Sequence, residues 1–427
     1  MTFTPTTVLN VHAWGRLVGA VAESGRAYAF EYDPAWVRDG LPLSPILMVP
    51  TARRRIFSFP GLNYETFQGL PPMLADAAPD RFGNGIIDAV LAREGVGPSD
   101  VTPLDRLAYV GARAMGALTF TPDTSPKDLP TAVELNHLVE AARAAVQGDL
   151  SDERVATRSL NELIQVGTSA GGARAKAVIA WNRATGEIRA GSIPAPEGFE
   201  QWLLKFDGLG DDAQLGIGQN YGRTEYAYSL MARAAGIEMS ECLLLEEGGR
   251  AHFATRRFDR PGDAGKRLHM QSLCGLAALD FNATETNDYA SLFTTAAELG
   301  ISDTEQIFRR MVFNVLASNN DDHTKNHAFL MDPEGTWSLA PAYDVTFAYN
   351  PRSIWTRKHL MSVNGKFEHI TRDDLHAVGE TFQVPGYRAI VRDVEAVVAG
   401  WTDFAAEAEL PAERTDAVQE RLLEVRL

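Results

Sequence analysis

Hydrophobic and polar residues alternate in short runs over the first part of the chain, up to about residue 125. Arg26–Tyr32 alternates in this way and stops at Asp33-Pro34, which predicts a half-buried strand followed by a turn. Leu118–Thr121, which is followed by Pro122, predicts another strand. Because several prolines interrupt the residues in between, we expect this stretch to form a loop-rich α+β lobe.

The pattern changes after residue 125. A turn-prone segment at 123–130 predicts a linker, and apolar residues between Leu135 and Val146 then recur at helical spacing. Residues 160–205 are β-rich, with a hairpin turn predicted at Asn182–Gly186. From about residue 222 the periodicity is helical, and three helices are predicted. They cover Arg223–Ala235, which Gly236 terminates, Ile307–Leu316 and Val391–Trp401.

Composition and charge narrow the class of protein. The chain has 427 residues, of which 45% are hydrophobic and 22% charged, as in an ordinary folded protein. The net charge of -16, from 56 acidic and 40 basic residues, argues against a nucleic-acid binder, although a local basic patch remains compatible with it. We see neither an export signal nor an apolar run of membrane-spanning length, and we therefore expect a cytoplasmic protein without membrane contact.

Two cysteines, Cys242 and Cys274, lie among apolar neighbours. Cysteine is commonly a small buried hydrophobic residue, so we expect both to be reduced core residues. No paired Cys/His spacing suggests a zinc site.

The most informative polar segment is Asn319–Asn326, which follows a predicted helix. Asp321 and Asn326 are five residues apart, the separation of the base and the metal-binding Asn in protein-kinase catalytic loops. Asp344 follows the strand-like Trp337–Leu339, where a kinase has its metal-binding Asp. A capped, Asp-rich loop after a helix would have a similar composition, but the three residues together predict a Mg²⁺ site of hard oxygen ligands.

Upstream, a loop of small residues extends from Val166 to Lys176. Such loops let backbone N–H groups approach phosphates, although this one does not match the Walker A pattern and could equally be an ordinary turn. Lys205 follows an apolar strand-like run, as a phosphate-anchoring kinase lysine does, and Glu225 on the next predicted helix is a candidate partner for it. A solvent-exposed Lys and Glu are the alternatives.

These pieces together resemble the HipA family of toxin kinases, whose helical C-terminal lobe is similar to that of phosphoinositide-type kinases. The resemblance covers most of the chain, with six motifs in the family's order. They are Pro79–Asn84 and Arg106–Leu118 for the N-terminal domain, Ser169–Lys176 for the glycine loop, Arg257–Arg260 for the hinge, Asp321–Asn326 for the catalytic loop and Tyr343-Asp344 for the metal motif.

The resemblance implies an α+β, bilobal kinase-like fold with an extra N-terminal β-rich domain and a large all-helical C-terminal lobe. We expect a HipA N-terminal-like domain at residues 1–125, an ATP-binding lobe at 126–255 and a helical lobe at 256–427.

It also implies residue roles in ATP- and Mg²⁺-dependent Ser/Thr phosphorylation. Asp321 would be the general base, Asn326 and Asp344 would bind Mg²⁺, and Ser169 would be autophosphorylated, with the adjacent Thr168 as an alternative. Phosphate at Ser169 would repel the ATP phosphates and expel the loop. The residues implied to bind ATP are Gly171, Gly172, Ala173, Arg174, Lys176, Lys205, Arg257, Phe258, His323, Lys325 and Asn326.

Two positions are less certain in role. Arg256 stands where family members often carry an acidic hinge residue, which puts one adenine contact in doubt. His323 could contact the nucleotide or hold the shape of its loop.

The resemblance further implies partners. We expect a DNA-binding antitoxin of the HipB type, DNA contact through that antitoxin alone, and an aminoacyl-tRNA synthetase as the substrate. Two other functions remain open, namely a kinase for a small molecule or lipid head group and an inactive nucleotide-binding scaffold. The intact set Lys205, Asp321, Asn326 and Asp344 argues against the scaffold.

Overall fold

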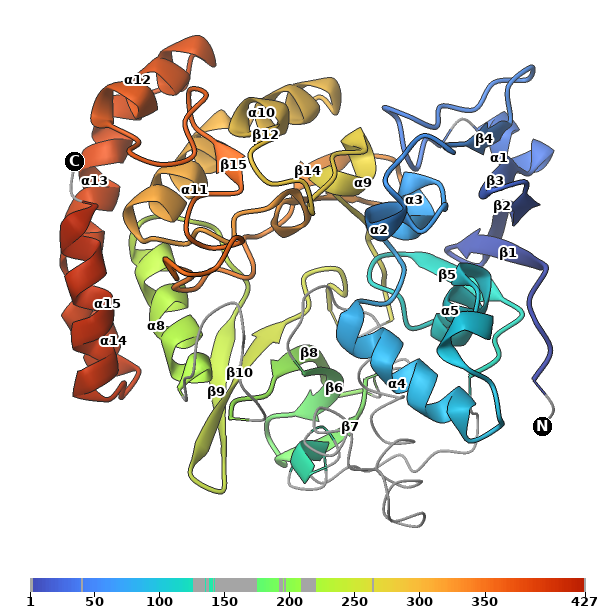
Figure 1. The fold of residues 1–427 in the computed structure, drawn as a ribbon, viewed down its shortest axis with the longest axis horizontal. Coiled ribbons are helices and arrows are strands. Elements are labelled where there is room, and N and C mark those ends of the chain that lie inside the picture. The colour runs from blue at the N-terminus through green and yellow to red at the C-terminus, as the bar shows by residue number, and fades with distance from the viewer. Residues whose placement is uncertain are drawn as a thin grey trace.

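The computed structural model describes residues 3–39, 41–125, 135, 138–140, 142, 175–191, 195, 197–208, 220–262 and 265–425. It contains both helices and sheets, which confirms the α+β class. Figure 1 shows the N-terminal sheet in blue on one side, a second sheet in green, and the helices of the C-terminal part in orange and red on the opposite side. In the described part of the chain, no helix is long and apolar enough to cross a membrane.

The N-terminal sheet has five antiparallel strands in the order β4-β3-β2-β1-β5. The alternation predicted for Arg26–Tyr32 is confirmed at its end, since Phe30 and Tyr32 are buried in a core shared with Trp36 while Glu31 between them is exposed. The elements are β1 (Val8–Ala13), β2 (Arg16–Ser24), β3 (Ala27–Tyr32), α1 (Pro34–Asp39), β4 (Ile56–Ser58), α2 (Tyr64–Phe67), α3 (Pro72–Ala75), α4 (Arg81–Ala92), η1 (Pro98–Asp100), α5 (Pro103–Val110) and β5 (Leu118–Thr121).

The second sheet has the strand order β7-β6-β8-β10-β9. It consists of β6 (Lys176–Asn182), β7 (Glu187–Ala190), β8 (Glu200–Lys205), β9 (Cys242–Glu247) and β10 (Arg250–Arg256), and α8 (Tyr221–Ala234) packs against it. The predicted hairpin is confirmed by the antiparallel pairing of β6 and β7. Lys176 and Lys205 are paired in register on β6 and β8, which brings the end of the predicted glycine loop next to the lysine predicted to bind phosphate.

The C-terminal part is mostly helical, but the expectation of an all-helical lobe is wrong in detail. A three-stranded sheet, β11-β13-β14, and a two-stranded parallel pair, β12-β15, lie among the helices. All four residues of β13 are apolar and buried, so its backbone groups need ladder partners. The strands are β11 (His269–Ser272), β12 (Asn287–Asp288), β13 (Ala328–Met331), β14 (Trp337–Leu339) and β15 (Met361–Ser362).

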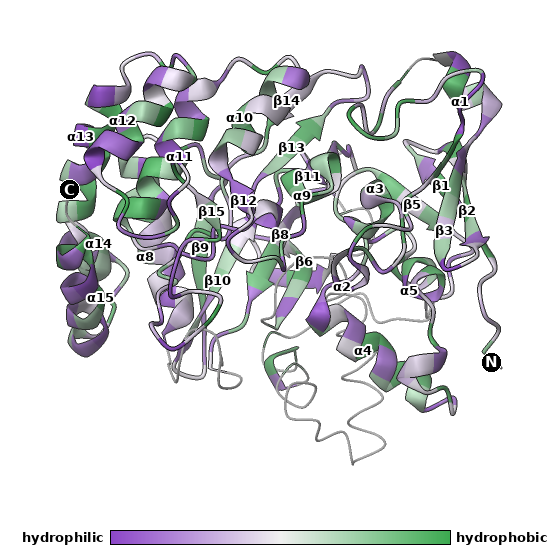
Figure 2. Cartoon of the chain, turned by 45° about the horizontal axis from the view of Figure 1, so that its top comes forward, coloured by the Kyte–Doolittle hydropathy of each residue, from purple (hydrophilic) through white to green (hydrophobic). Residues whose placement is uncertain are grey.

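The helices of this part are amphipathic around one large core. Figure 2 shows hydrophilic and hydrophobic bands along α13 and α15, as expected for helices at a surface. The elements are α9 (Leu273–Ala277), α10 (Tyr289–Glu298), α11 (Thr304–Leu316), η2 (Thr324–Asn326), α12 (Arg372–Thr381), α13 (Tyr387–Ala399), α14 (Trp401–Glu407) and α15 (Ala412–Glu424).

Helix boundaries show where the sequence pattern was sufficient. The helices predicted at Arg223–Ala235 and Ile307–Leu316 are confirmed as α8 and α11. The helix predicted up to Trp401 is wrong at its end, because α13 stops at Ala399 and Trp401 begins α14 after Gly400. Both cysteines are buried free thiols, as expected.

The domain boundaries at residues 125 and 255 stay predictions. Helix α4, which precedes residue 125, places Ile86 and Ile87 in the same apolar core as Trp202 and Leu204 of β8. The N-terminal part therefore packs directly on the sheet that carries Lys205.

Candidate functional site

Lys205 lies at the centre of a buried ionic network. It ends β8, where Trp202 and Leu204 are buried on the opposite face. Its Nζ donates to Oε1 of Glu225 on α8 at 2.5 Å and also to a carboxylate oxygen of Asp344. Burial opposes the charge of Lys205, but Asp344 and Glu225 outweigh this effect and hold the pKa of Lys205 above its usual value. The predicted Lys205–Glu225 pairing is confirmed.

Asp344 is held in an unusual conformation. Its φ of 52° is in the left-handed region, which a non-glycine residue occupies at a cost of about 1–3 kcal/mol and which Asp tolerates better than most side chains. Burial favours the neutral carboxyl, but Lys205 and then Lys176 hold the pKa of Asp344 below its usual value. The neighbouring Tyr343 donates its hydroxyl to the backbone carbonyl of Lys325 at 2.5 Å. A hydrogen bond thus joins the predicted metal motif to the predicted catalytic loop.

The spacing between Asp321 and Asn326 has a structural reason. Nδ2 of Asn326 donates to the backbone carbonyl of Asp321 at 2.7 Å, which closes the loop over the turn η2. With the NH₂ group used in this way, the Oδ1 atom of Asn326 is the end that can face a cation. The Asp321 carboxylate is 38% exposed, as a proton acceptor for an incoming hydroxyl must be.

Asp322 is a residue that sequence reasoning missed. Its side chain is fully buried and accepts hydrogen bonds from the Tyr289 hydroxyl at 2.8 Å and the Leu360 N–H at 2.7 Å, with His359 Nδ1 at 2.9 Å. It therefore anchors the loop that presents Asp321. The spacing to Asn326 singles out Asp321, but no local sequence signal predicts the burial of Asp322, because its partners are 30 to 40 positions away.

His323 and Lys325 flank the ring of Phe281. The ring centroids of His323 and Phe281 are 5.4 Å apart, and Nζ of Lys325 lies 4.7 Å from the Phe281 centroid. Nε2 of His323 is 3.8 Å from the Asp321 carboxylate, an ion pair when the imidazole is protonated. These contacts suit a role in holding the loop, and the nucleotide contacts of both residues stay predictions.

These groups line one cleft with a volume of about 730 Å³. This volume is in the range of small-molecule and cofactor sites. Eight of the predicted site residues line it, and so do residues of the N-terminal part such as Asp80, Arg81 and Met115. The eight are Lys205, Arg257, Phe258, Asp321, His323, Lys325, Asn326 and Asp344.

The donor set fits Mg-ATP. Asn326 and Asp344 offer the hard oxygen atoms that Mg²⁺ prefers, and Lys205 offers a cation for phosphates. In the described ranges no group of three or more His, Cys, Asp or Glu side chains could hold a metal ion. Mg²⁺ commonly binds through one or two protein oxygens together with substrate phosphates and water, so a two-residue site suffices.

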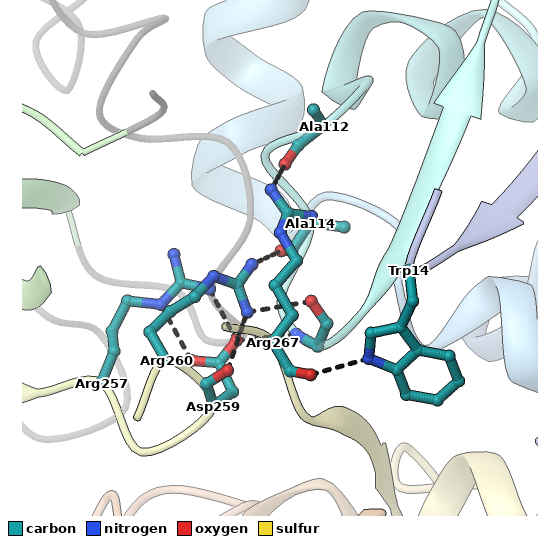
Figure 3. Close-up of polar contacts among 8 residues, drawn as sticks. Trp14, Ala112, Ala114, Arg257, Asp259, Arg260 and Arg267 are labelled. Carbon is teal, nitrogen blue, oxygen red and sulfur yellow. Dashed lines mark hydrogen bonds and ion pairs between the residues drawn. The ribbon is translucent and has the colours of Figure 1, made fainter. Parts of the chain in front are cut away.

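The predicted hinge, Arg257–Arg260, is hydrogen-bonded to the N-terminal part through Asp259 (Figure 3). Arg257 donates to both oxygens of this fully buried carboxylate, at 2.9 and 2.7 Å, and Arg260 donates to one of them at 2.6 Å. The Gly116 N–H, which belongs to the loop before β5, donates to the same carboxylate at 2.7 Å. Burial alone would raise the pKa of Asp259, but the two guanidinium groups hold it well below its usual value.

The hydrogen bonds to Asp259 bear on the nucleotide contacts predicted for the hinge residues. Arg257 borders the cleft, but two of its guanidinium nitrogens are directed at Asp259, so a nucleotide contact from its side chain stays a prediction. Phe258 packs against Tyr343, with ring centroids 5.6 Å apart, and both line the cleft. At Arg256, where family members often carry an acidic residue, a guanidinium nitrogen lies 3.2 Å from a carboxylate oxygen of Glu200.

Most of the glycine loop, including Ser169, Gly171, Gly172, Ala173 and Arg174, lies outside the described residues. Its last residue, Lys176, begins β6 and forms an ion pair with Asp80 at 3.2 Å. Both side chains are at least 95% buried. Asp80, which belongs to the motif Pro79–Asn84, also caps α4 by accepting a hydrogen bond from the Gly83 N–H.

Comparison with known proteins identifies the family. Residues 9–121 match the HipA N-terminal domain, and residues 168–401 match the HipA-like C-terminal domain. In Sinorhizobium fredii (strain NBRC 101917 / NGR234), "Putative kinase Y4mE" is 25% identical over 370 residues, or 80% of this chain and 78% of that protein. "Putative kinase Y4dM" of the same organism is 26% identical over 168 residues, or 36% of this chain and 39% of that protein.

A solved structure shares the fold. It is the Shewanella oneidensis MR-1 toxin–antitoxin complex of HipA, HipB and operator DNA, with a TM-score of 0.65, 17% identity, and coverage of 98% of this chain and 96% of that chain. The two matched domains together span most of the sequence, and one of them contains the whole Lys205–Asp344 site. The chain therefore belongs to the HipA family.

Proposed function

We propose that this chain is an ATP- and Mg²⁺-dependent serine/threonine protein kinase and the toxin of a HipA/HipB-type toxin–antitoxin system. The observation that carries the proposal is that the Asp321 carboxylate, the Asn326 amide and the Lys205–Asp344 ion pair line one cleft. This set suits phosphoryl transfer, in which the protein mainly positions groups and compensates charge.

Each group has a role that follows from its chemistry. Asp321 accepts the proton of the phosphoacceptor hydroxyl, because its carboxylate is partly exposed at the cleft. Lys205 binds nucleotide phosphates, and Glu225 keeps its ammonium group charged and oriented. Asn326 and Asp344 would hold Mg²⁺. Bound Mg-ATP supplies the phosphoryl group and the metal charge that neutralises it.

The remaining assignments complete the nucleotide site. The glycine loop from Gly171 to Lys176, together with His323 and Lys325, binds the phosphates, and Arg257 and Phe258 border the adenine. Ser169 is the autophosphorylated residue, with Thr168 as the alternative. A phosphate on this loop would repel the ATP phosphates and switch the enzyme off.

The partner assignments rest on family membership and on the fold shared with a HipA chain that was solved with HipB and operator DNA. We propose a HipB-type antitoxin as the partner, with DNA contacted through it, and an aminoacyl-tRNA synthetase as the phosphorylated substrate.

Labelling with radioactive ATP in a cell lysate tests the proposal. Wild type with Mg²⁺ should label itself and a band of the size of a tRNA synthetase, and Asp321→Asn should lose both signals. Asp393→Asn, an equal charge change at an exposed position of α13, is the matched control and should retain them. Equal labelling by wild type and Asp321→Asn would remove Asp321 from its role. Turnover of a metabolite without protein labelling would instead indicate a small-molecule kinase.

A further inference from the structure

A loop at residues 350–358 reaches the cleft through Trp355 and contacts the predicted catalytic loop. Trp355 lines the cleft together with Asp321 and His323. Nδ2 of Asn320, the residue before Asp321, donates to the backbone carbonyl of Thr356 at 3.0 Å. The loop therefore lies next to the carboxylate that would accept the proton of a phosphoacceptor hydroxyl.

This loop is held in one shape by bonds to the catalytic loop and within itself. Directly after it, the Leu360 N–H donates to buried Asp322. Inside it, the Trp355 N–H donates to Oγ of Ser353 at 3.2 Å, and the Arg357 N–H donates to the Ser353 carbonyl at 3.1 Å. Ser353 and Thr356 are buried. The loop therefore has a defined conformation before a ligand binds, and this reduces the conformational entropy that the loop loses on binding.

Apolar and cationic side chains occupy the outward side. Ile354 is 63% exposed, one of the most exposed large hydrophobic residues among those described. Arg352 and Arg357 are exposed, and neither lies within ion-pair distance of a carboxylate in the described part of the chain. Lys358, in contrast, is neutralised by Glu285 at 3.1 Å and Glu368 at 2.9 Å.

The charge of this loop is opposite to that of the molecule. Residues 350–358 contain three cations and no acid, in a chain with a net charge of -16. Arginine pairs with carboxylates in a two-pronged geometry, and charge patterns next to the active site are a common basis of kinase specificity. The exposed aliphatic residue between the two arginines supplies an apolar anchor.

We propose that the 350–358 loop docks the segment of the protein substrate that carries the phosphoacceptor hydroxyl. It selects segments in which an aliphatic residue and carboxylates flank the Ser or Thr. The aliphatic residue packs on Ile354 and Trp355, and the carboxylates pair with Arg352 and Arg357. The inference rests on the proposed kinase function and names its substrate class.

Two synthetic peptides test this selection. Each has one Ser and one Leu, with either Asp or Lys at the flanking positions, and kcat/KM is measured for both with Mg-ATP. Wild type should prefer the Asp peptide by about tenfold or more, because two exposed ion pairs each contribute up to about fivefold. Arg352→Glu/Arg357→Glu should reverse the preference, and Ile354→Asp should lower kcat/KM for both peptides.

The matched control is Arg53→Glu/Arg388→Glu, which changes the net charge equally at exposed positions outside the cleft lining. It should leave the peptide ratio as in wild type. The inference is overturned if wild type prefers the Lys peptide, or if Arg352→Glu/Arg357→Glu leaves the ratio of the two kcat/KM values unchanged. It is also overturned if this double variant loses RNA binding while its ratio of kcat/KM values stays that of wild type. If wild type labels itself or lysate proteins but neither peptide, the docking inference fails; if it labels nothing, the kinase function itself fails.

Discussion

Nζ of Lys176 lies 3.2 Å from a carboxylate oxygen of Asp80, and this buried ion pair joins the start of β6 to the first turn of α4. Lys176 ends the predicted glycine loop, whereas Asp80 belongs to the N-terminal part. The pair is therefore a direct connection between the N-terminal part and the strand that leaves the loop. Burial raises the pKa of the Asp80 carboxyl above its usual value in spite of the neighbouring Lys176.

The two partners of this ion pair should be energetically coupled in the folded state. Asp80→Asn retains a capping side chain for α4 but removes the carboxylate that lies 3.2 Å from Nζ of buried Lys176, so we expect a loss of about 3 kcal/mol in the free energy of unfolding. In Asp80→Asn/Lys176→Met the loss should be at least 1 kcal/mol smaller than the sum of the single losses. Urea denaturation of the four proteins measures this coupling, and strictly additive losses would contradict it.

Substitution of the adjacent residues Asp321 and Asp322 should have different effects, with activity lost at Asp321 and stability lost at Asp322. Asp322→Ala leaves the Tyr289 hydroxyl and the Leu360 N–H without their buried acceptor, and we expect a loss of about 3 kcal/mol in the free energy of unfolding. Asp321→Ala, at a partly exposed position, should change stability by about 0.5 kcal/mol or less while abolishing phosphoryl transfer. Thermal unfolding and ATP-dependent labelling of both variants measure the contrast, which equal stability losses would refute.

Glu225→Gln should lower kcat/KM for ATP without abolishing activity. The substitution removes one of the two carboxylates that hold Lys205, while Asp344 remains. We expect kcat/KM for ATP to fall by about tenfold, equivalent to about 1.4 kcal/mol of transition-state stabilisation. Steady-state kinetics measure it, with Glu420→Gln, an exposed residue of α15, as the control. Wild-type kinetics in Glu225→Gln would mean that Lys205 needs no second carboxylate.

Buried histidines should make the fold sensitive to acid. Burial lowers the pKa of His252, His269 and His327 from 6.5 to about 4. In the folded protein these rings stay neutral, whereas in the unfolded chain they bind a proton below pH 6.5. Their contribution to stability is therefore complete above pH 6.5 and is lost as the pH falls from 6.5 to about 4.

His269 offers a test of this dependence, because its buried Nδ1 has no partner for an added proton among the described residues and its Nε2 lies 2.9 Å from the Leu43 carbonyl. Between pH 7.5 and 4.5, His269→Gln should lose about 2.5 kcal/mol less of its free energy of unfolding than wild type. Urea denaturation at the two pH values measures the difference. An equal loss in both proteins would show that His269 is protonated in the fold.

Local patterns carried much of the fold and of the candidate site. The alternation of Arg26–Tyr32 was sufficient for β3, and helical spacing was sufficient for α8 and α11, because both patterns reflect which side of one element faces a core. The predicted pairing of Lys205 with Glu225 also holds, as does the grouping of Asp321, Asn326 and Asp344 around one cleft. These residues were found through the spacing that kinase chemistry imposes.

What the amino-acid order alone determined is the set of elements and the chemically apt residues, since propensity, periodicity and motif spacing act over a few residues. Only the tertiary structure decided that Asp322 anchors while Asp321 is presented, that Arg257 binds Asp259, and that Asp80 from the N-terminal part pairs with Lys176. Each of these outcomes depends on burial and on partners distant in sequence. Desolvation and ion pairing are set by the three-dimensional surroundings, which no local window of sequence contains.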